Sequence, residues 1–167
     1  SNHSAVNYNR CYRISDPHPW RVKRGVDPNW QNFYGKRETD SSYFTGGCGN
    51  EIYRSSHFSE EYHHNFFMCE PSQNILHRCI VERSGSGYRG HRPEEEQESE
   101  FVASTDQWFR PVNVRVGADG ALYVSDMYRE IIEDYSAIPR FLQQQYGVAY
   151  GDAHGRIWRL VSAEKPL

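Results

Sequence analysis

The sequence predicts an all-β fold, and three observations support this prediction. The 167 residues include 12 Tyr, 8 Phe and 4 Trp, and aromatic side chains favour strands. Residues 112–116 alternate apolar and polar side chains, as a strand with one buried face does. Asp119-Gly120 then turns the chain into a second strand at 121–125. A strand, an Asp-Gly turn and a strand ending in a charged loop are typical of the inner hairpin of a β-propeller blade.

A weak internal repeat indicates that the chain contains more than one blade. Residues 1–14, 66–80 and 122–161 each show a strand end with a small and a polar residue, a loop, and a new strand. Each new strand has an arginine between an aromatic or histidine and an apolar residue: Arg13, Arg78 and Arg159. Short strands can resemble one another by chance, but three matches in the same order favour a shared blade plan.

The predicted organisation is about two and a half blades of a larger propeller. The expected segments are residues 1–20 as the end of one blade, 21–48 as a long loop, 49–104 as a second blade with an acidic loop, and 105–167 as the last blade. A closed propeller typically needs about 4–8 blades. We therefore expect exposed edge strands, and self-association if these residues are made alone.

Short apolar or aromatic runs between turn residues define the expected strands. They are 49–54, 64–70, 74–83 and 88–92 in the second blade, then 112–116, 121–126 and 155–162 in the last. The acidic run 94–100 is expected to be solvated surface rather than a metal site. The last blade is interrupted by residues 130–154, with a short helical insertion near 136–147 that either packs over the loop after Asp126 or acts as a lid.

Composition and cysteine spacing exclude or weaken several function classes. The net charge of −3 gives no argument for nucleic acid or an anionic membrane, and no apolar run approaches the roughly 20 residues of a membrane span. Cys11, Cys48, Cys69 and Cys79 include no Cys-x-x-Cys pair, so zinc and c-type haem lack support. Cys48 and Cys69 fall on neighbouring strands, where either a disulfide or two buried thiols would fit.

Propeller topology predicts a binding site, because connections entering inner strands and leaving second strands share one face. On that face lie polar residues of both complete hairpins: Glu70, Asn74, Arg110, Asp126, Tyr128 and Arg129. Polar groups meeting at the mouth of a cavity are the usual sign of a binding site. The histidines at 57, 63, 64 and 77 do not form a convincing metal set, since 63 and 64 would point to opposite faces of a strand.

Each candidate residue has a chemical and a structural interpretation. Arg110 either binds a carboxylate or quinone oxygen or forms an ion pair with Asp126 or Glu70. Asp126 is either a general base or calcium ligand, or it accepts hydrogen bonds from backbone amides. Tyr128 and Arg129 either form a site wall or brace the insertion. Glu70 and Asn74 also fit ordinary turn positions.

Three stretches carry a family resemblance: Phe109–Glu133, Phe67–Arg78 and Gly155–Leu160. They resemble the propeller of the putative membrane-bound dehydrogenases of planctomycetes and, more distantly, the soluble glucose and sorbosone dehydrogenases. The distant relatives are six-bladed enzymes that use pyrroloquinoline quinone with calcium. The resemblance implies a larger exported, periplasmic parent protein, often fused to helical repeats and a haem c domain.

The resemblance implies the C-terminal part of an exported oxidoreductase acting on a sugar or alcohol. Arg110 matches the first arginine of an Arg-x-Arg-Asp-Val motif that approaches the quinone, whereas Val112 and Asn113 replace the second arginine and the aspartate. A catalytic histidine would lie outside this chain. The alternative is a non-catalytic propeller that binds carbohydrate or protein through its many tyrosines and tryptophans. A third possibility is a truncated product without activity of its own.

Overall fold

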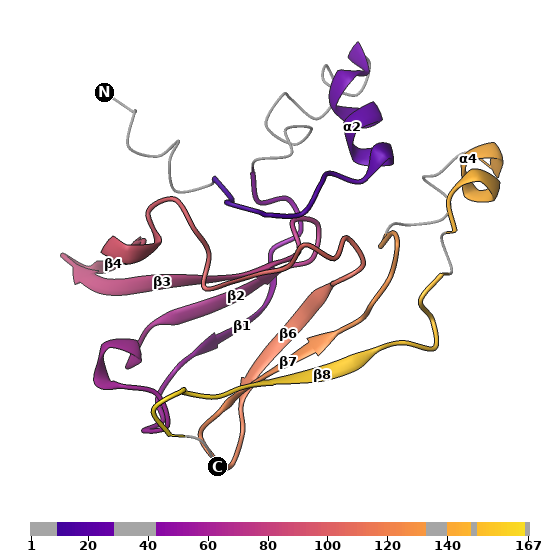
Figure 1. The fold of residues 1–167 in the computed structure, drawn as a ribbon. Helices are drawn as coiled ribbons and strands as arrows, with labels where there is room; N and C mark the ends of the chain where they lie inside the picture. The colour runs from indigo at the N-terminus through magenta and orange to yellow at the C-terminus, as the bar shows by residue number, and fades with distance from the viewer. Residues whose placement is uncertain (1–9, 29–42, 133–139, 148–149, 166–167) are drawn as a thin grey trace.

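The computed structural model describes residues 10–28, 43–132, 140–147 and 150–165. Within these residues the regular structure is mostly antiparallel strand with a few short helices, so the all-β prediction is confirmed (Figure 1). None of the helices in these ranges is long and apolar enough to cross a membrane. A propeller also requires a closed ring of blades, so that part of the expectation stays a prediction.

The first sheet is a meander of consecutive strands with a short additional strand. Its members are β1 (Cys48–Ile52), β2 (Phe66–Glu70), β3 (Ile75–Ser84), β4 (Gly87–His91) and β5 (Val102–Ala103). The first four pair in sequence order, and β5 pairs with the start of β3. The five strands lie between residues 48 and 103.

The second sheet has three strands among the described residues. They are β6 (Pro111–Val116), β7 (Leu122–Asp126) and β8 (Arg156–Leu160), in that order. The β6–β7 hairpin is the one predicted from the alternation at 112–116. Gly120 has a φ of +82°, a left-handed conformation that suits glycine, and a Cβ there would lie 2.4 Å from the Ser55 hydroxyl oxygen.

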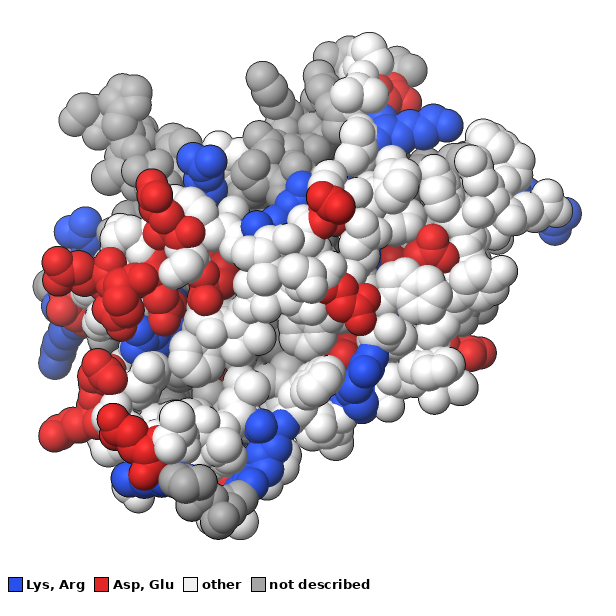
Figure 2. Space-filling model, in the orientation of Figure 1, with Lys and Arg blue, Asp and Glu red and all other residues white. Residues whose placement is uncertain are grey.

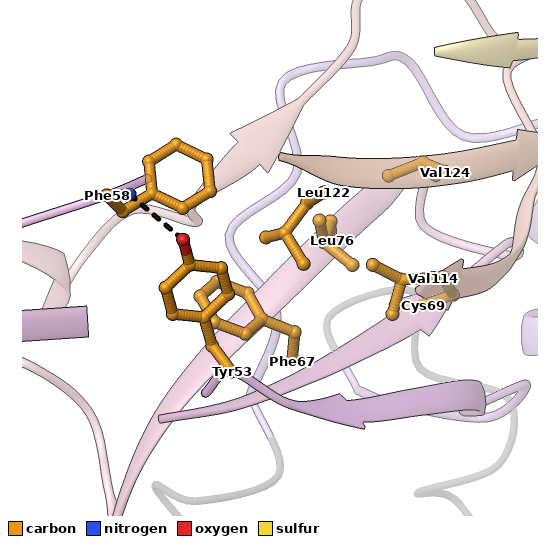
Figure 3. Packing of buried hydrophobic residues seen from close by; sticks show 8 residues of the cluster. All are labelled: Tyr53, Phe58, Phe67, Cys69, Leu76, Val114, Leu122 and Val124. Carbon is orange, nitrogen blue, oxygen red and sulfur yellow. Dashed lines mark hydrogen bonds between the residues drawn. The ribbon is translucent and has the colours of Figure 1, made fainter. Parts of the chain in front are cut away.

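The hydrophobic core lies between the two sheets, where β6 packs against β1 and β2 (Figure 3). Its buried members are Tyr53, Phe58, Phe67, Cys69, Leu76, Val114, Leu122 and Val124. The Tyr53 hydroxyl accepts a hydrogen bond from the Phe58 amide at 2.9 Å and donates one to the Gly120 carbonyl at 2.9 Å. This buried polar group is therefore satisfied and ties the first sheet to the β6–β7 turn.

Backbone contact between the sheets explains one glycine of β1. Gly49 has a φ of +47°, and a Cβ there would lie 2.3 Å from the Asn113 Cα atom and from the Val112 carbonyl oxygen of β6. Any side chain would force the two strands apart, so glycine is required at this position. The register of β1 against β2 shifts at the same place, between Cys48 and Asn50.

The expected end of a blade at 1–20 stays a prediction, and its described residues from 10 onward form no extended strand. Residues 1–9 lie outside the described ranges, and the next residues form only one isolated bridge, Arg10 to Tyr43. The helix α2 (Pro19–Val26) then occupies part of the predicted loop 21–48. The physical reason is Pro19, because proline lacks a ladder donor but suits the first turn of a helix.

The predicted helical insertion is present as α4 (Arg140–Gln145). Of the rest of the predicted span, residues 136–139 lie outside the described residues and residues 146–147 form a turn. Helices α2 and α4 are found beyond the same end of the two sheets, where β2 and β7 finish (Figure 1). The described connections at this end therefore include the residues proposed for a site.

The expectation that the run 94–100 is simply solvated surface is wrong for two of its glutamates. Glu94, Glu95 and Glu98 are exposed, and acidic side chains gather on one side of the molecule in Figure 2. Glu96 and Glu100, however, are buried. The run forms the 3₁₀ helix η2 (Glu94–Glu96) and then folds back over β3, whose basic side chains meet these two carboxylates.

Candidate functional site

Arg110 is buried at the entrance to β6 and donates to three backbone carbonyls. Its Nε bonds to the Arg129 carbonyl at 2.9 Å, one Nη to the Pro71 carbonyl at 2.7 Å, and the other Nη to the Glu130 carbonyl. Burial lowers the pKa of Arg110 to about 10, with a smaller contribution from nearby Arg21, so the guanidinium remains charged at neutral pH. Arg110 thus joins the β2–β3 turn to the segment after β7.

Asp126, at the end of β7, accepts three hydrogen bonds and forms one ion pair. Its Oδ1 receives the amides of Arg110 at 2.8 Å and Tyr128 at 3.0 Å. Its Oδ2 receives the Trp158 indole N–H at 3.0 Å and lies 3.2 Å from the Arg156 Nε. These contacts match the structural alternative from the sequence, in which Asp126 accepts hydrogen bonds from backbone amides. Two side chains, Trp158 and Arg156, add to those amides.

Glu70 and Asn74 hold the β2–β3 turn. The Glu70 carboxylate accepts from the amides of Thr45, Gly46 and Ser72 at 2.8–3.1 Å. Burial raises its pKa, although these three amides act in the opposite direction. Asn74 adopts a φ of +59° and donates to the carbonyls of Gln107 and Phe109. Both residues therefore act as structural ties rather than as open ligand groups.

The structure brings all six candidates together. Arg110 reaches the turn that carries Glu70 and Asn74, and its amide reaches Asp126. Tyr128 and Arg129 follow directly. Arg129 gives its carbonyl to Arg110, and Tyr128 adopts a φ of +49°. The convergence expected from topology thus exists, but its donors and acceptors bond to one another.

This arrangement does not fit pyrroloquinoline quinone with calcium at these residues. All three nitrogens of the Arg110 guanidinium and both oxygens of Asp126 are already engaged within the chain. Among the described residues no group of three or more His, Cys, Asp or Glu is placed to hold a metal ion.

A surface of different character adjoins the cluster, and we call it the aromatic shelf. It comprises Trp108, Tyr128, Tyr150, His154, Arg156 and Trp158. The Trp108 ring lies 5.8 Å from the Tyr128 ring and 6.4 Å from the Tyr150 ring, between centroids. The shelf thus runs from the insertion across the end of the second sheet to β8.

Arg156 is the charged centre of the aromatic shelf. Its guanidinium carbon lies 3.8 Å from the Tyr128 ring centroid and 5.3 Å from that of Trp158. The Nε atom faces Asp126, whereas the two Nη atoms have no hydrogen-bond partner within the described ranges. With Tyr150 63% and Trp158 44% exposed, the shelf offers flat apolar rings beside unused guanidinium donors.

Sequence reasoning identified only Tyr128 among the shelf residues. Arg156 and Trp158 lie inside the Gly155–Leu160 stretch that carries the family resemblance, but the sequence alone does not indicate a binding role for them. The usable signal was the alternation in β8, which places Arg156 and Trp158 on the same side as Asp126 of β7. Trp108 and Tyr150 come from loops distant in sequence, and no local pattern connects them.

Cys48 and Cys69 are register partners on β1 and β2, so the expected proximity is present. Both are free thiols in the structure, as are Cys11 and Cys79, and the disulfide alternative is not observed. Burial raises the pKa of Cys69 to about 12, and the neighbouring Cys48 adds to this effect. Cys69 is therefore a neutral core group at physiological pH.

Comparison with known proteins gives one family match. A family model described as a domain of unknown function, DUF7133, matches residues 4–164. No curated protein and no solved structure matches the chain. The match covers both sheets and the connections that carry the aromatic shelf.

Proposed function

The chain belongs to the DUF7133 family, and we propose that it is a non-catalytic propeller segment that binds carbohydrate on the aromatic shelf. The observation that carries this proposal is the contrast at one end of the second sheet. The side chains of Arg110 and Asp126 form their hydrogen bonds within the chain, while the aromatic rings of Tyr150 and Trp158 beside them are exposed. Such a surface is suited to a ligand with apolar faces and polar edges.

A sugar ring has this chemistry. Its C–H groups pack against an aromatic face, as the exposed rings of Tyr150 and Trp158 would allow. Its hydroxyl oxygens accept hydrogen bonds, which the Nη atoms of Arg156 can donate. Arg156 is held between two rings and Asp126, so little side-chain freedom is lost when a ligand binds.

The test is calorimetric titration of the full chain with a panel of soluble oligosaccharides and polysaccharides. We expect saturable binding that Tyr150→Ala weakens about tenfold, the loss of one aromatic stacking contact. The matched control is Tyr88→Ala, because Tyr88 is an even more exposed tyrosine on β4, remote from the shelf. Equal weakening by both variants, or binding to no sugar in the panel, would contradict the proposal.

A second candidate is the oxidoreductase implied by the resemblance, as part of an exported propeller enzyme for a sugar or alcohol. The observation in its favour is the meeting of Glu70, Asn74, Arg110 and Asp126 at one end of both sheets, where propeller sites lie. In this case these residues position backbone rather than contact the reacting groups. The experiment is a titration of the full chain with pyrroloquinoline quinone and calcium, followed by dye reduction. Saturable binding with turnover would favour this candidate over the first.

A further inference from the structure

The outer edge of β8 is open, unlike the corresponding edge in the first sheet. There the third strand, β3, is covered by β4 after a turn at 85–86. In the second sheet the third strand is β8, and within the described residues nothing pairs with its outer side. Ile157 is 69% and Trp158 44% exposed, an unusual density of apolar side chains for a free edge.

Residues 161–165, the described part of the chain after β8, do not turn back to cover it. The Ser162 amide donates to the His57 Nε2 at 3.1 Å, and the Lys165 ammonium donates to the Ser56 carbonyl at 2.7 Å. This segment is therefore bound to the loop after β1. A strand that covers β8 must therefore come from a different segment of this chain or from a second chain.

The hydrogen-bonding direction of each β8 residue follows from the adjacent hairpin. The Gly117 amide donates to the Ala121 carbonyl, so alternate β7 residues from 121 onward direct their backbone groups toward β6. The residues between them, including Val124, direct theirs toward β8 and bond to their register partners there, such as Trp158. The N–H and C=O groups of Ile157 and Arg159 consequently point to the open edge.

We propose that this edge pairs with β8 of a second copy of the chain, antiparallel about a two-fold axis at Trp158. In this register Ile157 of one copy exchanges both backbone hydrogen bonds with Arg159 of the other, and the reverse pair does the same. The two Trp158 side chains lie opposite each other, a favourable cross-strand pair. Such an isologous contact joins the two copies into one continuous sheet.

Charge and strand composition favour β8 over the other outer edge, β4. No arginine opposes an arginine in the proposed register, since Arg156 stands opposite Leu160 and Arg159 opposite Ile157. Arg159 is also neutralised within its own copy by Asp119. By contrast, β4 contains Gly87 and Gly90 and exposes Arg89 between them, a composition that weakens strand addition.

The dimer proposal shares Trp158 with the carbohydrate proposal but does not require sugar binding, and sedimentation equilibrium of the full chain in the absence of sugar tests it separately. We expect a reversible dimer whose dissociation constant rises at least about tenfold in Ile157→Pro, which removes the outward amide but no bond to β7. Ile157→Thr keeps that amide and should remain dimeric. Tyr88→Lys on β4 should leave the dimer unchanged. A monomer at every concentration, or a dimer unaffected by Ile157→Pro, would overturn the proposal.

A crosslinking experiment fixes the register without depending on the proline variant. Trp158→Cys places two thiols opposite each other in a non-hydrogen-bonded pair, where side chains are closest. Mild oxidation should therefore give a covalent dimer, whereas Ile157→Cys should give little, because its partner is Arg159. The unmodified chain under the same oxidant is the background control. Crosslinking of Ile157→Cys alone would overturn the register.

Discussion

The two sheets differ in how completely they are covered. In the first sheet β3 has β2 on one side and β4 with β5 on the other, and its polar residues His77 and Arg78 are buried. In the second sheet β8 has a partner on one side only among the described residues, and its Ile157 and Trp158 are exposed. The buried polar side chains of the first sheet indicate a structural role. The exposed apolar side chains of the second sheet indicate a binding surface.

The first sheet owes its coverage to a buried ionic network. Glu100 accepts from His77 Nδ1 at 2.7 Å and from Arg92 at 2.6 Å, and Glu96 accepts from the Arg78 Nε at 2.8 Å. The Arg78 guanidinium also lies over the Tyr62 ring, 4.5 Å from its centroid. Each buried charge thus has a partner, which is the condition for burying it at all.

The largest effect should come from the core shared by both sheets. Phe67→Ala removes a fully buried ring and should lower the free energy of unfolding by about 3–5 kcal/mol. Ile157→Ala on the open edge should change it by less than about 0.5 kcal/mol. Urea unfolding followed by tryptophan fluorescence measures both variants. Similar losses in the two would mean that β8 is not an open edge in solution.

The next effect separates structural from ligand-binding arginines. Arg110→Met leaves one buried and two partly buried carbonyls without their donor and should cost about 3 kcal/mol of unfolding free energy. The matched control is Arg115→Met, because Arg115 is largely exposed and bonds only at the surface, so its loss should stay below about 1 kcal/mol. The same urea assay applies. A stable Arg110→Met variant that loses ligand binding would return Arg110 to a binding role.

A smaller, pH-dependent effect concerns Glu100. Burial alone raises its pKa, but hydrogen bonds from His77 and Arg92 outweigh burial, and the pKa is held below the ordinary 4.5. The stabilisation that Glu100 provides is therefore present above pH 4.5 and is lost as the pH falls through the lowered pKa. We expect the stability difference between the wild type and Glu100→Gln to shrink as the pH falls below 4.5.

The wild type must be compared with Glu100→Gln because two other glutamates change the pH dependence of stability in the opposite direction. Burial raises the pKa of Glu70 and Glu96, so the folded chain takes up their protons more readily than the unfolded chain. Their contribution grows as the pH falls, with the opposite sign to that of Glu100. Chemical unfolding of both proteins at a series of pH values makes the measurement. A difference that stays constant with pH would contradict the assigned role of Glu100.

Local sequence patterns predict the strands, but they do not predict which charged side chains are buried. The β6–β7 hairpin follows from its alternation and from Asp119-Gly120, and the meander follows from short apolar runs with turn residues between them. Glu96 and Glu100 resemble their exposed neighbours in sequence. They are buried only because the chain folds back over β3, a tertiary event that composition does not encode.

The candidate site was predictable in position but not in chemistry. Topology alone brought Asn74, Arg110 and Asp126 to one end of the sheets. Whether such groups face a ligand or one another depends on carbonyl positions several residues away, as the three acceptors of Arg110 show. The aromatic shelf was missed because Trp108 and Tyr150 are joined only by the folded insertion.

The interruption of the second sheet also determines the order in which its strands assemble. The β6–β7 hairpin closes over residues 117–121, whereas β8 must return across residues 127–155 to reach β7. The longer closure costs about 1.5 kcal/mol more in chain entropy. The third strand of this sheet therefore docks last during folding and detaches first, so amide exchange in β8 reports on an opening that leaves the hairpin intact.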